Sequence, residues 1–202
     1  MRRIYSLGAT LTLAAAATIL LALSPQSQPE DAAPLPPGHP AINRPDAVVA
    51  HNVADPEDVK SIDAIVDAYY ESVSGPRGEP RDWDRLLSLF MPDARFIAAR
   101  AVDGKIIPFG MTPEKFVETN RTYFESGGYF ETDIHRRIDT YGSIAQVFST
   151  YASRRAKEDP EPYARGINSI QLMNTGDRWW ITTIMWDFER PDTQPIPEQY
   201  LP

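Results

Sequence analysis

Several polar side chains are expected on faces of strands that are otherwise apolar, where they could do chemistry. Gly142-Ser143 predicts a two-residue hairpin loop that pairs Arg136 with Ser149, and Thr175-Gly176 predicts a second that pairs Asn168 with Thr183. Inward faces are identified by their Ile, Val and Leu residues. The polar exceptions on these faces, joined by Tyr69 of a preceding helix, are Arg136, Ser149, Tyr151, Asn168, Thr183 and Asp187.

Buried polar groups need hydrogen-bond partners, so this set has two interpretations. In the first, the groups satisfy one another, and Arg136 pairs with Asp187 or Tyr151. In the second, they orient a ligand in an apolar pocket, and the ligand-binding residues are Tyr69, Arg136, Ser149, Tyr151, Asn168 and Thr183.

Catalysis in such a pocket would need a residue that transfers protons. The candidate catalytic residues are His135, Asp187 and Tyr151: His135 or Asp187 would move the proton, and Tyr151 would donate to an oxyanion. Arg136 would then hold a carboxylate or enolate. The register places His135 outward beside Thr150, and a slip of one residue would turn it inward.

The remaining polar patterns are interpreted as solvated surface. Glu131 is expected outward, paired with Arg154, on a face that also carries Asp133 and Asp139. The chain has no Cys and no paired His, so we expect no metal site. No glycine-rich loop follows a strand, and we expect no cofactor.

The outer face of the second hairpin carries large side chains. The predicted register turns Trp180, Ile184 and Trp186 outward, and an exposed apolar sheet face usually marks an interface. We therefore expect a homodimer that forms through this face.

The order of the elements predicts the fold. Asp55-Pro56 begins a long amphipathic helix that runs to Val73. A short helix, a strand hairpin that turns at Asp103-Gly104, and a third helix opened by Thr112-Pro113 follow. Four long antiparallel strands then run from Tyr129 to Glu189. Helices followed by a curved meander predict an α+β cone, a sheet wrapped around a helix.

Two segments carry a resemblance to a known family. The run from Asp84 to Phe96 resembles the "short helix, Phe, small loop, Asp-Ala, strand" segment of the nuclear transport factor 2-like superfamily, in particular its SnoaL-like branch. The segments from Gly166 to Leu172 and from Gly176 to Ile181 resemble its last two strands. The resemblance implies a cone-shaped fold over about Asp55 to Glu189. Members include isomerases, dehydratases and transport factors, and many dimerise through the outer sheet face.

The N-terminus predicts export. Arg2 and Arg3 precede an uncharged, Ala/Leu-rich run that ends at Leu23, the pattern of a secretory signal or an uncleaved anchor. The expected organisation is a signal peptide at residues 1–24, a Pro-rich flexible linker at 25–54, the domain at 55–190 and a C-terminal tail at 191–202. Periplasmic or extracellular localisation follows, and a membrane is a partner only if the segment stays uncleaved.

Composition narrows the function classes. The chain has 202 residues, 42% hydrophobic, which supports one domain with a substantial core. Its net charge of -8, without a basic stripe, argues against nucleic acid as a partner. Three hypotheses remain: an exported module that binds a small molecule, an isomerase- or dehydratase-type enzyme, and a dimerising structural domain without activity.

Overall fold

The computed structural model describes residues 53–202, so the predicted signal peptide and most of the predicted linker lie outside the described residues. The elements in chain order are α1 (Pro56–Val59), α2 (Ile62–Val73), α3 (Trp83–Ser88), β1 (Phe90–Val102), β2 (Lys105–Met111), α4 (Pro113–Gly127), β3 (Phe130–Tyr141), β4 (Ile144–Arg154), β5 (Ala164–Asn174), β6 (Trp179–Phe188) and the short 3-10 helix η1 (Glu198–Tyr200).

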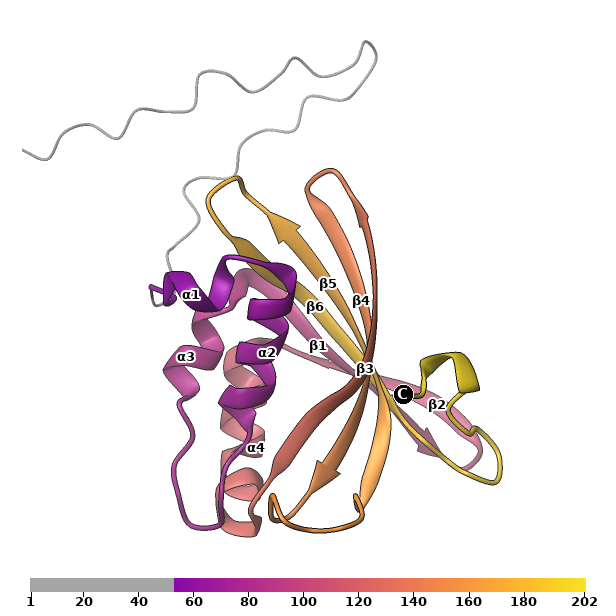
Figure 1. The fold of residues 1–202 in the computed structure, drawn as a ribbon. Coiled ribbons are helices and arrows are strands. Elements are labelled where there is room, and N and C mark those ends of the chain that lie inside the picture. Colours follow the sequence, from indigo (N-terminus) through magenta and orange to yellow (C-terminus); the bar gives the residue numbers. More distant parts are fainter. Residues whose placement is uncertain (1–52) are drawn as a thin grey trace, which may run out of the picture. The chain divides into compact units, whose positions relative to one another are not determined.

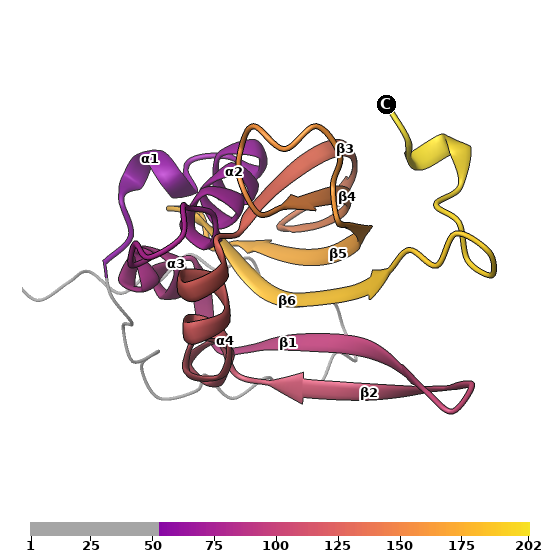
Figure 2. The ribbon, with the colours of Figure 1, turned by 90° about the horizontal axis from the view of Figure 1, so that it is seen from below.

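One six-stranded sheet with the order β2-β1-β6-β5-β4-β3 forms the frame of the domain. Neighbouring strands are antiparallel except β1 and β6, which run parallel. The sheet curves, and Figure 1 shows α1 to α4 gathered on one side of it. Figure 2, from below, shows the β1–β2 hairpin reaching beyond the helices. The predicted α+β cone is confirmed.

Local sequence signals set the helix boundaries. Asp55 caps α1 through its side chain, and Thr112 caps α4, each followed by a proline, as predicted. The single long helix expected from Asp55 to Val73 is wrong. Ser61 adopts an extended backbone and accepts a hydrogen bond from the Ala64 amide at 3.1 Å, which starts α2 separately from α1. The polar Ser in the helical pattern acts as a second cap.

The core fills the concave side of the sheet. Ile65 and Val66 of α2, fully buried, face Phe96 of β1 and Ile170 and Ile184 of the central strands across one continuous apolar cluster. Ring contacts reinforce it, including the stacking of Phe96 on Phe116 of α4 with centroids 4.1 Å apart. The sheet therefore closes around α2 and α4 and fixes their positions.

A β-bulge changes the predicted register of the first hairpin. Arg136 pairs with Ser149 as predicted, but Asp133, rather than Ile134, pairs with Tyr151. The irregularity between Asp133 and His135 reverses which side chains face inward toward the start of β3. Glu131, expected outward beside Arg154, instead pairs with Ser153 and is only 7% exposed. That prediction was wrong because a turn-based count cannot see a bulge.

The register of the second hairpin was also wrong. Asn174 pairs with Trp179, so the loop holds four residues, and its Asn174 side chain accepts from the Gly176 amide at 2.7 Å. A further irregularity follows Gln171. Asn168 pairs with Trp186 rather than Thr183. Ile184 is fully buried, so its expected outward position is wrong.

Trp186 likewise turns inward, where its ring meets Phe96 and Phe116 edge-on. Trp180 alone of the three expected interface residues faces outward as predicted, although its partner is Met173 and not the expected Gln171. Its ring lies under the Arg178 guanidinium, 3.6 Å from the ring centroid. The outer face is thus less apolar at these positions than the sequence predicted.

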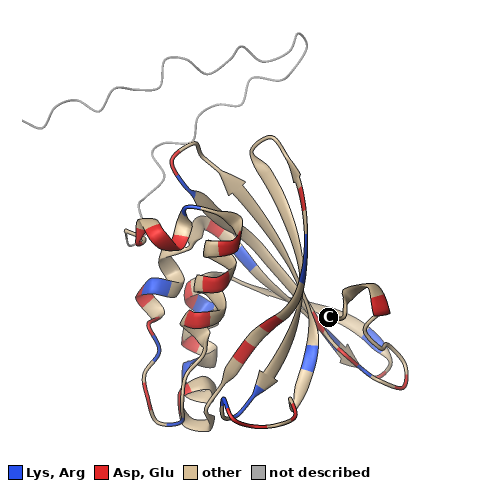
Figure 3. Cartoon of the chain, in the orientation of Figure 1, with Lys and Arg blue, Asp and Glu red and all other residues tan. Residues whose placement is uncertain are grey.

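Arg136 ties β3 to α2 instead of facing a ligand. Its guanidinium contacts Asp63 at 2.9 Å, Asp67 at 2.5 Å and the carboxylate of Asp133. Asp133 also accepts from the His135 amide at 3.1 Å, so it bridges the bulge. Figure 3 marks acidic positions along α2, the helix that supplies Asp63 and Asp67. The expected pairing of Arg136 with Asp187 or Tyr151 is wrong.

Arg136→Met should lower the free energy of unfolding by about 2 kcal/mol, because the Asp133 side chain, 8% exposed, would lose its cation. Urea unfolding measures the effect. Arg137→Met is the matched control: Arg137 and Asp139 are both more than half exposed, and we expect a loss below about 0.5 kcal/mol. Equal losses for the two variants would contradict a stabilising role of the Arg136 network.

Candidate functional site

A pocket of about 320 Å³ opens inside the cone, between α2, α4 and the strands β3 to β6. Aromatic residues dominate its wall, and one carboxylate, two amides and several hydroxyl groups supply its polarity. Its lining residues are Tyr69, Val73, Phe116, Asn120, Tyr123, Phe124, Tyr129, Glu131, Tyr151, Ser153, Tyr163, Ala164, Asn168, Trp186 and Phe188. This combination of an apolar wall and a few convergent polar groups is typical of a small-molecule site.

Glu131 is the ionisable acid of this pocket. The Asn168 amide donates to its Oε1 at 3.1 Å, and the Ser153 hydroxyl lies 3.5 Å from its Oε2. The Tyr129 hydroxyl donates to the same Oε2. The bulge in β3 is what brings this side chain inside, because it turns Glu131 to the face shared with Tyr151.

Burial raises the pKa of the Glu131 carboxyl to about 7, and the hydrogen bonds from Asn168 and Ser153 partly oppose the rise. Glu131 therefore changes protonation near neutral pH. A carboxyl group with this property in a cavity is suited to proton transfer and marks a candidate functional site.

Tyr151 supplies an unused polar group. Among the described residues its hydroxyl is the buried side-chain atom that has no hydrogen-bond partner. Gly166 makes room for this ring, since a Cβ at that position would lie 2.4 Å from the Tyr151 hydroxyl. Desolvation raises the pKa of Tyr151, so the hydroxyl keeps its proton. A ligand in the pocket could satisfy it.

A hydrogen-bonded group behind the pocket holds Asn168 in place. Asn168 donates to the Tyr70 hydroxyl at 3.0 Å, and that hydroxyl lies 2.6 Å from Ser149 Oγ. The Tyr70 and Ser149 side chains are buried, so these hydrogen bonds replace the ones that their hydroxyl groups would otherwise make to water. Ser149 therefore supports the site from behind and does not line it.

The structure brings together three of the predicted site residues and separates the rest. Tyr69, Tyr151 and Asn168 line the pocket. Thr183 pairs with Gln171 on the opposite face of the sheet. The inward position expected for Thr183 is therefore wrong. Arg136 lies outside the pocket, in its ion pairs with acidic side chains.

The two other catalytic candidates also lie away from this pocket. His135 pairs with Thr150, whose hydroxyl bonds the Tyr200 carbonyl on the outer face, so His135 is outward as its register predicted. Asp187 pairs with Ile167 and also faces outward, contrary to prediction. Its salt bridge to Arg190, at 2.8 Å, holds the pKa of its carboxyl below the ordinary value.

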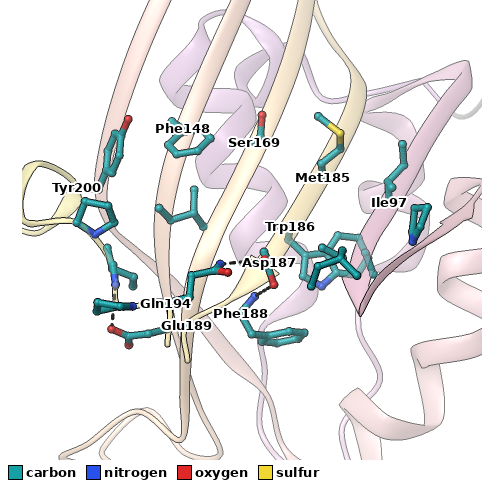
Figure 4. Close-up of a pocket in the computed structure, with 18 residues that line it drawn as sticks. Ile97, Phe148, Ser169, Met185, Trp186, Asp187, Phe188, Glu189, Gln194 and Tyr200 are labelled. Atoms are coloured by element: carbon teal, nitrogen blue, oxygen red, sulfur yellow. Dashed lines mark hydrogen bonds between the residues drawn. The ribbon is translucent and has the colours of Figure 1, made fainter. Parts of the chain in front are cut away.

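A second cavity, of about 460 Å³, lies on the outer face, where Asp187 takes part in its lining (Figure 4). The C-terminal tail borders it through Ile196 and Tyr200, and Tyr200 packs against Phe148. Its acids are already paired: Asp187 with Arg190 and Gln194, and Glu189 with Arg165 at 2.8 Å. This groove therefore offers shape but few free polar groups.

The sequence interpretation missed Glu131, because alternation of acids and bases along β3 resembled a solvated face. The available signal was Asp133, whose side chain can accept a hydrogen bond from the backbone amide two residues later, at His135, and so stabilise a bulge. That signal is weak without a structure.

Within residues 53–202, no three or more His, Asp or Glu side chains are grouped so that they could hold a metal ion. Within the same residues, no helix has the length and apolar character needed to cross a membrane.

Comparison with solved structures identifies the fold. The chain is 17% identical to a provisionally assigned scytalone dehydratase from Novosphingobium aromaticivorans, over 69% of this chain and 93% of that one, with a TM-score of 0.50. A nuclear transport factor 2-like protein of unknown function from Shewanella baltica is 15% identical over 62% and 89%, with a TM-score of 0.46. Another nuclear transport factor 2-like protein of unknown function, from Silicibacter pomeroyi, is 14% identical over 64% of this chain and 94% of that one, with a TM-score of 0.45.

These likenesses concern the fold. The chain has the nuclear transport factor 2-like fold that its short motifs resemble. No family profile matches the chain, and no curated protein sequence matches it. The chemistry of the pocket must therefore be argued from its own residues.

Glu131→Gln should remove a pH-dependent loss of stability. The folded-state pKa of about 7 exceeds the ordinary 4.5, so the folded protein loses stability as the pH rises from about 4.5 to about 7. The variant should match wild type at about pH 4.5 and exceed its free energy of unfolding by about 3 kcal/mol at about pH 8.

Urea unfolding at the two pH values provides the measurement. Glu118→Gln, at a solvated position on α4, is the control and should follow wild type at both values. A Glu131→Gln variant that also follows wild type would show that Glu131 ionises normally.

Proposed function

We propose that this domain binds a small, largely apolar molecule inside the cone. The observation that carries the proposal is the buried Tyr151 hydroxyl, which lines the pocket and has no partner among the described residues. An unsatisfied buried hydroxyl costs about 1 to 3 kcal/mol, and a polar group of a ligand would recover it. The aromatic wall would hold the rest of the ligand.

The open pocket disfavours the hypothesis of an inactive structural domain. A vestigial site would be expected to collapse or to be filled by side chains, whereas about 320 Å³ remains between Tyr69, Phe116 and Trp186. The hydrogen bonds behind the pocket, from Ser149 through Tyr70 to Asn168, keep one polar wall fixed. A prearranged wall of this kind lowers the entropic cost of binding.

A second candidate function is acid–base catalysis of the isomerase or dehydratase type. The observation in its favour is Glu131, whose pKa of about 7 lets it give or take a proton near neutral pH. Tyr151 would donate to the developing oxyanion. Glu131 takes the role that the sequence interpretation gave to His135 or Asp187.

Tyr151→Phe should weaken ligand binding while the fold is kept. A suitable probe is cumyl alcohol, a phenyl ring that carries a tertiary alcohol and fits the mixed wall. Loss of one hydrogen bond of about 1 kcal/mol predicts an affinity reduced about fivefold, measured by ligand-observed NMR titration.

The matched control is Tyr141→Phe, because Tyr141 lies 83% exposed at the tip of the β3–β4 hairpin. It should bind cumyl alcohol as wild type does. If Tyr151→Phe and Tyr141→Phe bind the probe equally, the hydroxyl does not contact the ligand. Absence of binding to wild type at about 10 mM would contradict the proposal as a whole.

We further propose that the protein is exported and forms a homodimer through the outer sheet face. The basic start and apolar run at residues 1–24 support export. The groove on the outer face and exposed Met173 and Met185 support an apolar contact there.

Native mass spectrometry of protein from the extracytoplasmic fraction tests both proposals together. The expected mass is that of two chains, each beginning between about Ser24 and Ala50. A full-length chain recovered only from the cytosol would contradict export. A single-chain mass at about micromolar concentration would contradict the dimer.

A further inference from the structure

The pocket inside the cone has one ionisable charge and it is negative. Its lining contains Glu131 and no Lys, Arg or His. Nine of the fifteen lining residues are aromatic. The face of an aromatic ring carries negative potential, so rings and carboxylate together favour a cation over an anion.

Two of the lining rings already hold a cation in this structure. The Arg155 guanidinium carbon lies 4.8 Å from the centroid of the Tyr123 ring and 4.4 Å from that of Tyr163. Both tyrosines line the pocket and are nearly half exposed, so they form its mouth. The Arg155 contacts show that aromatic rings of this pocket wall are placed so that they can contact a positively charged group.

We propose that the ligand of this pocket is a small organic cation, an amine or a quaternary ammonium compound with an apolar body. The cation would contact the aromatic wall and the Glu131 carboxylate, and Tyr151 Oη would accept or donate a hydrogen bond. This inference rests on the proposed binding function and names the class of ligand.

Burial of a charge in the cone needs compensation, and the structure offers it. Asn168 and Tyr129 donate to Glu131 and stabilise its ionised form when a cation arrives. Aromatic cages are a recurrent means by which proteins bind quaternary ammonium groups. The acidic chain, at a net charge of -8, also attracts cations to the domain.

The charges and titratable groups around Glu131 come from four elements or their flanks. Tyr69 and Tyr70 on α2, Tyr129 before β3, Tyr151 on β4 and Tyr163 before β5 surround it. Burial raises the pKa of Tyr69, Tyr70 and Tyr151, so these three stay neutral at ordinary pH. Arg155 at the mouth is a positive charge that contacts the Tyr123 and Tyr163 rings, and it is not one of the lining residues.

Binding of the cation should therefore follow the ionisation of Glu131. The cation favours the charged carboxylate, and by linkage its affinity should fall as Glu131 takes up a proton below about pH 7. A permanent cation isolates this effect, because the probe itself does not titrate.

The test compares phenyltrimethylammonium with cumyl alcohol, which has nearly the same shape and no charge. Titrations of the full domain are followed by calorimetry or ligand-observed NMR. At about pH 8 the cation should bind at least about tenfold more tightly than the alcohol, and at about pH 5 this preference should be lost. Affinity for the alcohol should not change with pH.

Glu131→Gln keeps the shape of the side chain and removes its charge. In this variant the preference for phenyltrimethylammonium should vanish at both pH values, while Glu118→Gln keeps it. Thermal unfolding confirms that both variants are folded. If both variants lose the preference for phenyltrimethylammonium, the preference comes from the general acidity of the chain, and the inference is wrong.

The outcomes distinguish failure of the cation inference from failure of the proposed binding function. If cumyl alcohol binds as tightly as the cation at about pH 8, the cation inference is wrong and the proposed binding function stands. If benzoate binds more tightly than either, the ligand is an anion and the inference is equally wrong. If wild type binds none of the three, the proposed function fails with it.

Discussion

The site depends on one backbone irregularity, the bulge in β3 between Asp133 and His135. Without it, alternation along the strand would leave Glu131 in solvent, and the pocket lining would lose its carboxylate. Asp133 stabilises the bulge by accepting from the His135 amide, and Arg136 in turn holds Asp133 and the acids of α2. Arg136, which the sequence predicted to bind a ligand, thus helps to hold the bulge that turns Glu131 into the pocket.

A buried acid destabilises the fold when it ionises, and the surrounding groups limit that cost. Asn168, Ser153 and Tyr129 supply hydrogen bonds to Glu131, and Tyr70 and Ser149 fix Asn168 from behind. The result is a carboxyl that is near balance between its two forms at neutral pH. The same balance suits a ligand that carries charge or a reaction that moves a proton, and both depend on this one group.

Much of the fold could be predicted from the sequence, because caps and turns are local signals. Asp55-Pro56, Thr112-Pro113 and Asp103-Gly104 mark boundaries that the structure contains, and the Gly142-Ser143 loop fixed the first pairs of its hairpin correctly. The site could be predicted only in part. A bulge reverses the facing of every residue beyond it, so Glu131 was missed, and a four-residue loop with a second irregularity exchanged the faces of Thr183 and Trp186. Tyr151 and Asn168 lie on β4 and β5, where the predicted facing held, and both line the pocket.

The most direct test of the account is the pKa of Glu131 itself. A carboxyl-carbon NMR titration of uniformly labelled protein, with Glu131→Gln to assign the resonance, would follow this one group. The account predicts a midpoint near 7, moved to lower pH when phenyltrimethylammonium is added. A midpoint near the ordinary 4.5, unchanged by the cation, would show that Glu131 is solvated and would contradict the placement on which the site rests.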